Sequence, residues 1–248
     1  MMELLKKLYE PHTLLARSRL DSDSSIRRLL DPSLKPIVLE RFLIEWMARA
    51  SYMTEPVDGW IRRTGQRCIE QGMERLGQSL ITHAKSETGH HLMTIEDARA
   101  LVLHWNGRHT PQLNMEQLLG QTPTESMKEY RQLHEETIEG PYPVGQISIE
   151  REIGFLAVHF GPRMMKQVEN VLGKEVADKL TFLAEHVAVD VGHTLLNEKM
   201  LEDAITRSPE NARIYAETGA RAMTTYIRFL GDCLHIAEDL LAPLRAVA

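Results

Sequence analysis

The chain has 248 residues, of which 43% are hydrophobic and 26% are charged, and its formal net charge is −6. These values are typical of a soluble globular protein, and we expect a single domain over residues 1–248. No basic cluster interleaves with aromatics, no apolar run approaches the ~20 residues that span a bilayer, and the N-terminus lacks signal-peptide features. We therefore expect a cytoplasmic protein with neither a nucleic-acid nor a membrane partner.

Helical periodicity and turn residues predict an all-α fold. Pro36 suits the first turn of a helix, and the Glu55-Pro56 pair should end that helix. No segment shows the pattern of a strand, so we predict a helical bundle of about seven or more helices. The expected helices cover residues 1–20, 24–31, 36–54, 57 to beyond 76, a segment through 83–90, 115–120, 124–139, 147–160, 164–172, 175–200 and 209–241.

Two segments repeat one spacing of metal-binding residue types. Residues at i, i+4 and i+7 lie within about 60° of one another around a helix axis. Each segment should therefore place two imidazoles and one carboxylate on one helical face, and two facing triplets could hold one or two iron or manganese ions. A single such pair is expected by chance among 11 histidines, whereas the repeat is not. The triplets are His83, Glu87 and His90, and then His186, Asp190 and His193.

Gly89 conflicts with a helix through the first triplet, because glycine costs about 1 kcal/mol relative to alanine inside a helix. We interpret it as a position of close backbone approach beside the ligands. The run Gly140-Pro141-Tyr142-Pro143 is the strongest break in the chain. The two triplets lie on either side of this break and need each other, so it is not interpreted as a domain boundary.

A binuclear site usually has about six protein ligands and several carboxylates, so a further acidic ligand is expected. Glu150 and Glu152 lie on opposite flanks of the apolar stripe of the helix expected over 147–160. Gly154 and Ala157 follow Glu150 at i+4 and i+7 and leave room for its side chain and a metal. This favours Glu150, but both residues remain candidate ligands.

At these residues the sequence resembles the haem-oxygenase-like di-iron oxidases, relatives of the thiaminase-like and PqqC-like seven-helix proteins. The resemblance covers about residues 36–200 and rests on HxxxExGH ending at His90, SIEREIG, and HxxxDxxH ending at His193. Family members often have a second acidic residue before the first Glu, where this chain has Ser86. The resemblance implies a haem-oxygenase-like helical bundle with metal ligands Glu87, His90, Glu150 or Glu152, His186, Asp190 and His193, and with His83 as a hydrogen-bonding partner of Glu87 or of substrate.

The resemblance further implies two iron ions, with manganese as an option, because the ligand types suit both metals. It implies oxidation of a small molecule such as an amine, amino acid or fatty acid by O2, and it allows a homodimer. Trp46, Tyr52 and His159 are hypotheses for pocket lining. Arg62, Arg63 and Arg151 are candidates to bind a substrate carboxylate.

Two alternatives stay open. One is a metal-free enzyme of the same fold, thiaminase-like or PqqC-like, which relies on a pocket cysteine or on substrate-binding histidines. The other is a non-catalytic metal-binding helical protein. Cys68 and Cys233 are far apart without CxxC spacing, so we expect free buried thiols. The chain has no GxGxxG, GxxxxGK[ST] or GxSxG motif, which removes the usual support for nucleotide binding or serine hydrolysis.

Overall fold

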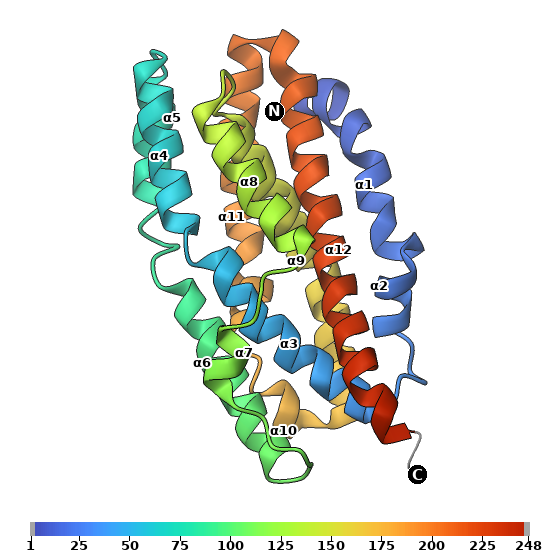
Figure 1. Cartoon of the computed structure of the whole chain (residues 1–248). Helices are drawn as coiled ribbons and strands as arrows, with labels where there is room; N and C mark the ends of the chain where they lie inside the picture. The colour runs from blue at the N-terminus through green and yellow to red at the C-terminus, as the bar shows by residue number, and fades with distance from the viewer. Residues whose placement is uncertain (1–2, 246–248) are drawn as a thin grey trace.

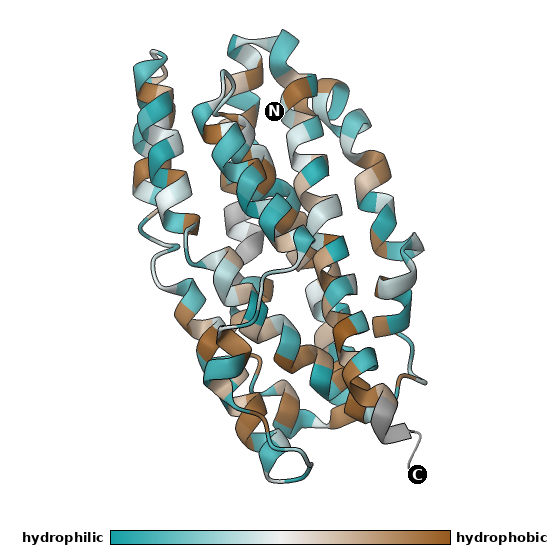
Figure 2. Ribbon diagram, viewed as in Figure 1, coloured by the Kyte–Doolittle hydropathy of each residue, from teal (hydrophilic) through white to brown (hydrophobic). Residues whose placement is uncertain are grey.

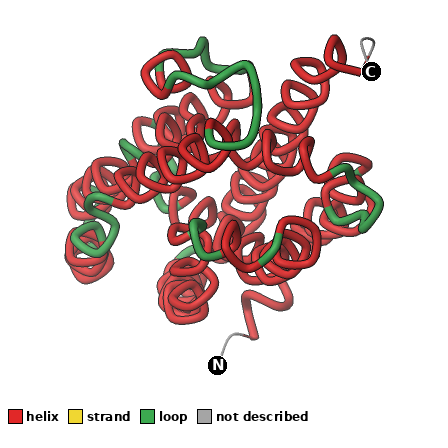
Figure 3. Tube along the Cα trace, turned by 90° about the horizontal axis from the view of Figure 1, so that it is seen from below, coloured by secondary structure: helices red, strands yellow, loops and turns green. Residues whose placement is uncertain are grey.

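The computed structural model describes residues 3–245, with the backbone alone described for 188–191, 193 and 243–245. Every regular element in this part of the chain is a helix (Figure 3), as the sequence predicts. In chain order the elements are η1 (Leu5–Tyr9), α1 (Glu10–Ser22), α2 (Ser24–Leu29), α3 (Pro36–Thr54), α4 (Val57–Glu70), α5 (Glu74–His83), α6 (His90–Asn106), α7 (Met115–Leu119), α8 (Glu125–Glu139), α9 (Gly145–Leu172), α10 (Lys174–Ala177), α11 (Thr181–Arg207), η2 (Pro209–Asn211) and α12 (Ala212–Arg245).

Local signals set several helix ends where the sequence predicts them. The Asp23 side chain accepts hydrogen bonds from the backbone N–H groups of Ser25 and Ile26 and caps α2. Helix α3 begins at Pro36 and ends just before Glu55, as expected. The helix expected from residue 57 to beyond 76 is instead two antiparallel helices, α4 and α5, separated at Gly72, whose φ is +75°.

Helix α9 runs unbroken through the Gly161-Pro162 pair, where the sequence predicts a break or kink. Phe160 and Met164, on either side of the pair, are both buried in the core. Packing thus outweighs the hydrogen bond that proline removes. A Cβ at Gly161 would lie 2.6 Å from Val187 Cγ2 on α11, so the glycine also permits close approach of these two helices.

Helix α9 lies at the centre of the arrangement and packs against α8, α10, α11 and α12 (Figure 1). Helix α3 packs against α6 and α12, and the α4–α5 pair lies at one side of the molecule. Brown, hydrophobic segments alternate with teal ones along most helices (Figure 2), as expected when one stripe of each helix is buried. The buried aromatic and aliphatic side chains include Phe42, Trp60, Trp105, Phe160 and Phe229.

None of the described helices is long and apolar enough to cross a membrane. Cys68 and Cys233 are free and buried, as the sequence predicts.

Candidate metal centre

The first triplet does not lie on one helix, and the expectation of a helical face for it is wrong. Helix α5 ends at His83, residues 84–89 form turns, and α6 begins at His90. Gly89 has φ +89°, a left-handed conformation that glycine adopts without steric cost. A Cβ there would have no atom within 4 Å, so Gly89 serves the turn and not a close backbone approach.

The turn still brings the side chains of the triplet together. Nδ1 of His90 lies 2.9 Å from Oε2 of Glu87, and Nε2 of His83 lies 3.9 Å from Oε1 of Glu87. The Ser86 hydroxyl donates to the His83 carbonyl at 2.7 Å and lies 3.3 Å from His83 Nδ1. Ser86 thus holds the end of α5 at the position where relatives are expected to carry an acidic residue.

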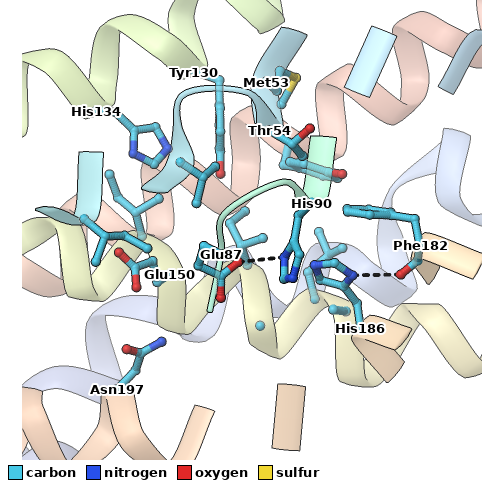
Figure 4. A pocket seen from close by; sticks show the side chains of 18 of the residues that line it. Met53, Thr54, Glu87, His90, Tyr130, His134, Glu150, Phe182, His186 and Asn197 are labelled. Atoms are coloured by element: carbon cyan, nitrogen blue, oxygen red, sulfur yellow. Dashed lines mark hydrogen bonds and ion pairs between the residues drawn. The ribbon is translucent and has the colours of Figure 1, made fainter. Parts of the chain in front are cut away.

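His186 joins this group from α11 (Figure 4). Its Nδ1 lies 2.7 Å from the carbonyl oxygen of Phe182, so Nδ1–H donates and Nε2 keeps its lone pair for a metal. Glu87, His90 and His186 each offer one ligand atom, and these three atoms all lie within 4.8 Å of one another. Ligands on opposite sides of an ion with ~2.1 Å bonds are about 4.2 Å apart, so small side-chain movements would bring all three onto one ion.

Asp190 and His193, the other members of the second triplet, have side chains outside the described residues. Their backbones belong to α11, which is continuous from Thr181 to Arg207. The expectation that the second triplet lies on one helix is therefore confirmed for the backbone.

Glu150 faces the cavity that the triplet lines (Figure 4). Its Oε2 lies 3.5 Å from Nε2 of His83. Burial lowers the pKa of His83, but the hydrogen bond to Glu150 and the charges of Glu150 and Glu87 outweigh burial, and the net pKa is raised. His83 therefore lies between two carboxylates, and its role as a hydrogen-bonding partner of Glu87 or of substrate stays a prediction. Gly154 and Ala157 line the same cavity.

Glu152 points elsewhere, and the structure does not place it among the candidate ligands. Its carboxylate is fully buried and accepts 2.8 Å hydrogen bonds from Arg17 and from Arg151. Tyr9 Oη donates a further hydrogen bond, of 3.1 Å. Glu152 points away from Glu150 because two residues along a helix are about 200° apart around its axis. Its hydrogen bonds with Tyr9 and Arg17 connect the N-terminal helices to α9.

The cavity beside the triplet has a volume of about 140 Å³. Several residues that were expected to line the cavity do not border it. Trp46 packs in the core against Phe42 and Phe160, Tyr52 lies under Arg131, and His159 is exposed.

The arginines that were candidates to bind a substrate carboxylate also lie away from the cavity. Arg63 pairs with Glu135 and Glu139, Arg151 pairs with Glu152 and Glu198, and Arg62 is largely exposed.

Helix α8 supplies cavity residues that sequence reasoning missed. Tyr130 and His134 line the cavity from α8, with Gln146 and Glu150 from α9 and Asn197 from α11. In the sequence Tyr130 belongs to an apolar stripe and His134 to no motif, so no local signal distinguishes them from core residues. Only the packing of α8 over α9 brings them to the site.

No protein-family model and no curated protein matches the chain. Solved structures match it over nearly the whole length. A domain of unknown function with a haem oxygenase-like fold from Shewanella denitrificans has a TM-score of 0.73 and 16% identity, covering 96% of this chain and 95% of that one. A TenA homolog from Pseudomonas syringae pv. tomato has a TM-score of 0.69 and 11% identity, with 94% and 93% covered.

A CADD-like protein of unknown function from Nostoc punctiforme has a TM-score of 0.59 and 12% identity, covering 92% of this chain and 95% of that one. The chain therefore has a haem oxygenase-like fold, as the sequence resemblance implied. At these identities the likeness shows the fold alone.

Proposed function

We propose that this protein is a metal-dependent oxidase that binds two iron ions and uses O2 to oxidise a small molecule in the cavity beside Glu87. The observation that carries the proposal is the convergence of Glu87 and His90, which lie in the turn before α6 and at its first residue, with His186 from α11. Two imidazoles and a carboxylate form a mixed nitrogen and oxygen ligand set, which suits iron or manganese.

A second ion requires more ligands than these three. Glu150 is a candidate because it lines the same cavity and contacts His83, which in turn contacts Glu87. Asp190 and His193 are further candidates, because they follow His186 at helical spacing on α11. The proposed ligand set is Glu87, His90, Glu150, His186, Asp190 and His193.

The surroundings of the ligands fit such a role. The Phe182 carbonyl fixes the tautomer of His186, and His83 keeps the Glu87 and Glu150 carboxylates near each other. Apolar residues such as Ile153, Leu156 and Phe160 line much of the remaining cavity. A bound iron pair would supply oxygen activation, while the protein orients the substrate and keeps it from solvent.

The placement of the cysteines does not favour a metal-free enzyme with a pocket cysteine. Cys68 and Cys233 are both fully buried, and neither lines the cavity. Burial raises the pKa of the Cys68 thiol to about 12, so this side chain is a poor nucleophile.

The test is iron loading of chelator-treated protein under anaerobic conditions, followed by metal analysis and by oxygen uptake on exposure to O2. We expect two irons per chain and oxygen consumption. His90→Ala should reduce the iron content, whereas His91→Ala, a neighbouring histidine outside the group, should not. Failure to retain iron would refute the oxidase, and iron binding without oxygen uptake would point to a non-catalytic metal-binding protein.

A further inference from the structure

The cavity contains a buried hydrogen-bond acceptor that the metal centre does not use. His134 is 2% exposed and lines the cavity from α8. Its Nδ1 lies 2.8 Å from Oε1 of Gln146, while its Nε2 has no hydrogen-bond partner in the described part of the chain. A buried polar atom without a partner costs about 1–3 kcal/mol, so this nitrogen is either a stability defect or a binding group.

Neighbouring side chains hold the His134 ring in one orientation. Trp60 stacks on it with a centroid distance of 3.8 Å and an interplanar angle of 8°, and the Tyr130 ring meets it edge-on at 4.7 Å. The Trp60 indole is itself fixed by a 2.7 Å hydrogen bond to Glu135. The ring is therefore pre-organised before any ligand arrives.

The hydrogen bonds of Gln146 determine which nitrogen carries the proton. The Gln146 amide N–H donates to Oε1 of Glu150 at 3.3 Å, so its carbonyl oxygen faces His134 and must accept from Nδ1–H. Burial lowers the pKa of His134 to about 3, which keeps the ring neutral. Nε2 is consequently a lone-pair acceptor.

Other groups that line the cavity include further acceptors, tyrosine and threonine hydroxyls, and apolar side chains. Oδ1 of Asn197 is buried without a hydrogen-bond partner in the described part of the chain, and Glu150 adds a carboxylate (Figure 4). Met53 and Ile149 line the space nearby. The cavity volume of about 140 Å³ is close to the ~150 Å³ of an apolar cavity that holds benzene, so a ligand has about six non-hydrogen atoms.

We propose that His134 binds the N–H or O–H group of a small amine or alcohol substrate at Nε2, with the short apolar chain of the substrate lying in the cavity toward Glu87 and His90. The assignment of this ligand as a substrate rests on the proposed oxidase function. A carboxylate would instead face the His134 lone pair and the carboxylates of Glu87 and Glu150, which repel it.

The experiment measures binding of n-butylamine, 1-butanol and butyrate to the chelator-treated full-length protein by ligand-observed NMR. For ligands of this size we expect dissociation constants of about millimolar. Butylamine or butanol should bind about tenfold more tightly than butyrate. His134→Phe, which retains an aromatic ring against Trp60, should weaken donor binding about fivefold to tenfold.

The matched control is His159→Phe, because His159 is an exposed histidine outside the cavity and should leave binding unchanged. Binding of butylamine alone would identify an amine site, and binding of butanol alone an alcohol site. Equal binding of all three probes, no binding of either donor, or unchanged donor binding in folded His134→Phe would overturn the proposal. If that variant does not fold, 1-butanol is compared with its uncharged isomer diethyl ether, which has no O–H donor, and equal binding of the two would overturn the proposal.

This test is independent of the proposed function. It uses metal-free protein, so donor binding is measured whether or not the chain takes up iron. Conversely, His134→Phe should retain the iron content of the unmodified protein, because His134 is outside the proposed ligand set. If the unmodified protein binds no iron but still binds the donor probes more tightly than butyrate, the oxidase is refuted and the acceptor site at His134 remains.

Discussion

The carboxylate of Asp97 accepts a 2.9 Å hydrogen bond from the backbone N–H of Phe182. A second hydrogen bond, of 2.6 Å, comes from the hydroxyl of Thr181. Asp97 lies on α6, which begins at His90, and it caps the first turn of α11, which carries His186. One buried side chain therefore sets the relative position of two helices that each supply a candidate metal ligand.

Asp97→Ala should lower the free energy of unfolding by about 2–3 kcal/mol, because it removes a helix cap and two charge-assisted hydrogen bonds. Urea unfolding of the metal-free protein measures this loss. The iron affinity should fall as well, since α11 is released from α6. Thr181→Val, which removes only the hydroxyl donor, should have a smaller effect on both. An iron affinity unchanged by Asp97→Ala would show that the cap does not position the centre.

His134 predicts a pH dependence of stability. Its pKa is lowered to about 3 by burial, against about 6.5 in the unfolded chain. Between these values the unfolded state binds a proton that the folded state does not, so stability falls as the pH drops from 6.5 toward 3.

This contribution amounts to about 1.4 kcal/mol per pH unit within that window. In urea unfolding between pH 7 and 4.5, His134→Phe should therefore lose stability less steeply than the unmodified protein. The exposed His159→Phe variant should follow the unmodified protein. Identical slopes for all three would mean that the pKa of His134 is the same in the folded and unfolded states.

Gly89→Ala tests the turn between Glu87 and His90. A side chain at φ +89° costs about 1–2 kcal/mol, and relief of the strain would move both ligands. The matched control is Gly72→Ala, which has φ +75° and open space around it but lies away from the centre. Both variants should lose similar stability, and only Gly89→Ala should lose iron affinity. Equal iron binding in the two variants would contradict the assigned role of the turn.

Glu150 and Glu152 offer a paired test of the mid-chain ligand. Glu150→Gln should reduce the iron content from two ions to one. Glu152→Gln should retain two ions but lower the unfolding free energy by about 3–5 kcal/mol, because Arg17 and Arg151 lose their buried counter-charge. Metal analysis and urea unfolding of both variants separate the roles. Loss of iron in Glu152→Gln with unchanged stability would reverse the assignment.

Metal binding should also stabilise the fold. Ferrous iron or manganese at about one hundred times its dissociation constant adds about 2.7 kcal/mol, which for a chain of this size raises Tm by about 5–10 °C. Thermal unfolding with and without metal measures the shift. His193→Ala should reduce it, whereas an unchanged shift would remove His193 from the proposed ligand set.

The sequence by itself determined the fold class and many helix ends. Pro36 and the Glu55-Pro56 pair act within one turn of the backbone, so their effect on α3 can be predicted locally. The two triplets likewise consist of His, Glu and Asp, residue types that are common metal ligands in many folds. Gly89 carried a signal too, since its conflict with a helix marked the turn that the structure contains.

Only the tertiary structure decided how the candidate site is assembled. Glu150 and Glu152 are equivalent by periodicity, and the choice between them depends on Arg17, which lies 135 residues from Glu152 in sequence. His134 reaches the cavity because α8 packs over α9, and no local pattern shows this. A side chain's partners are set by packing between distant segments, and helical periodicity gives its direction only relative to its own helix.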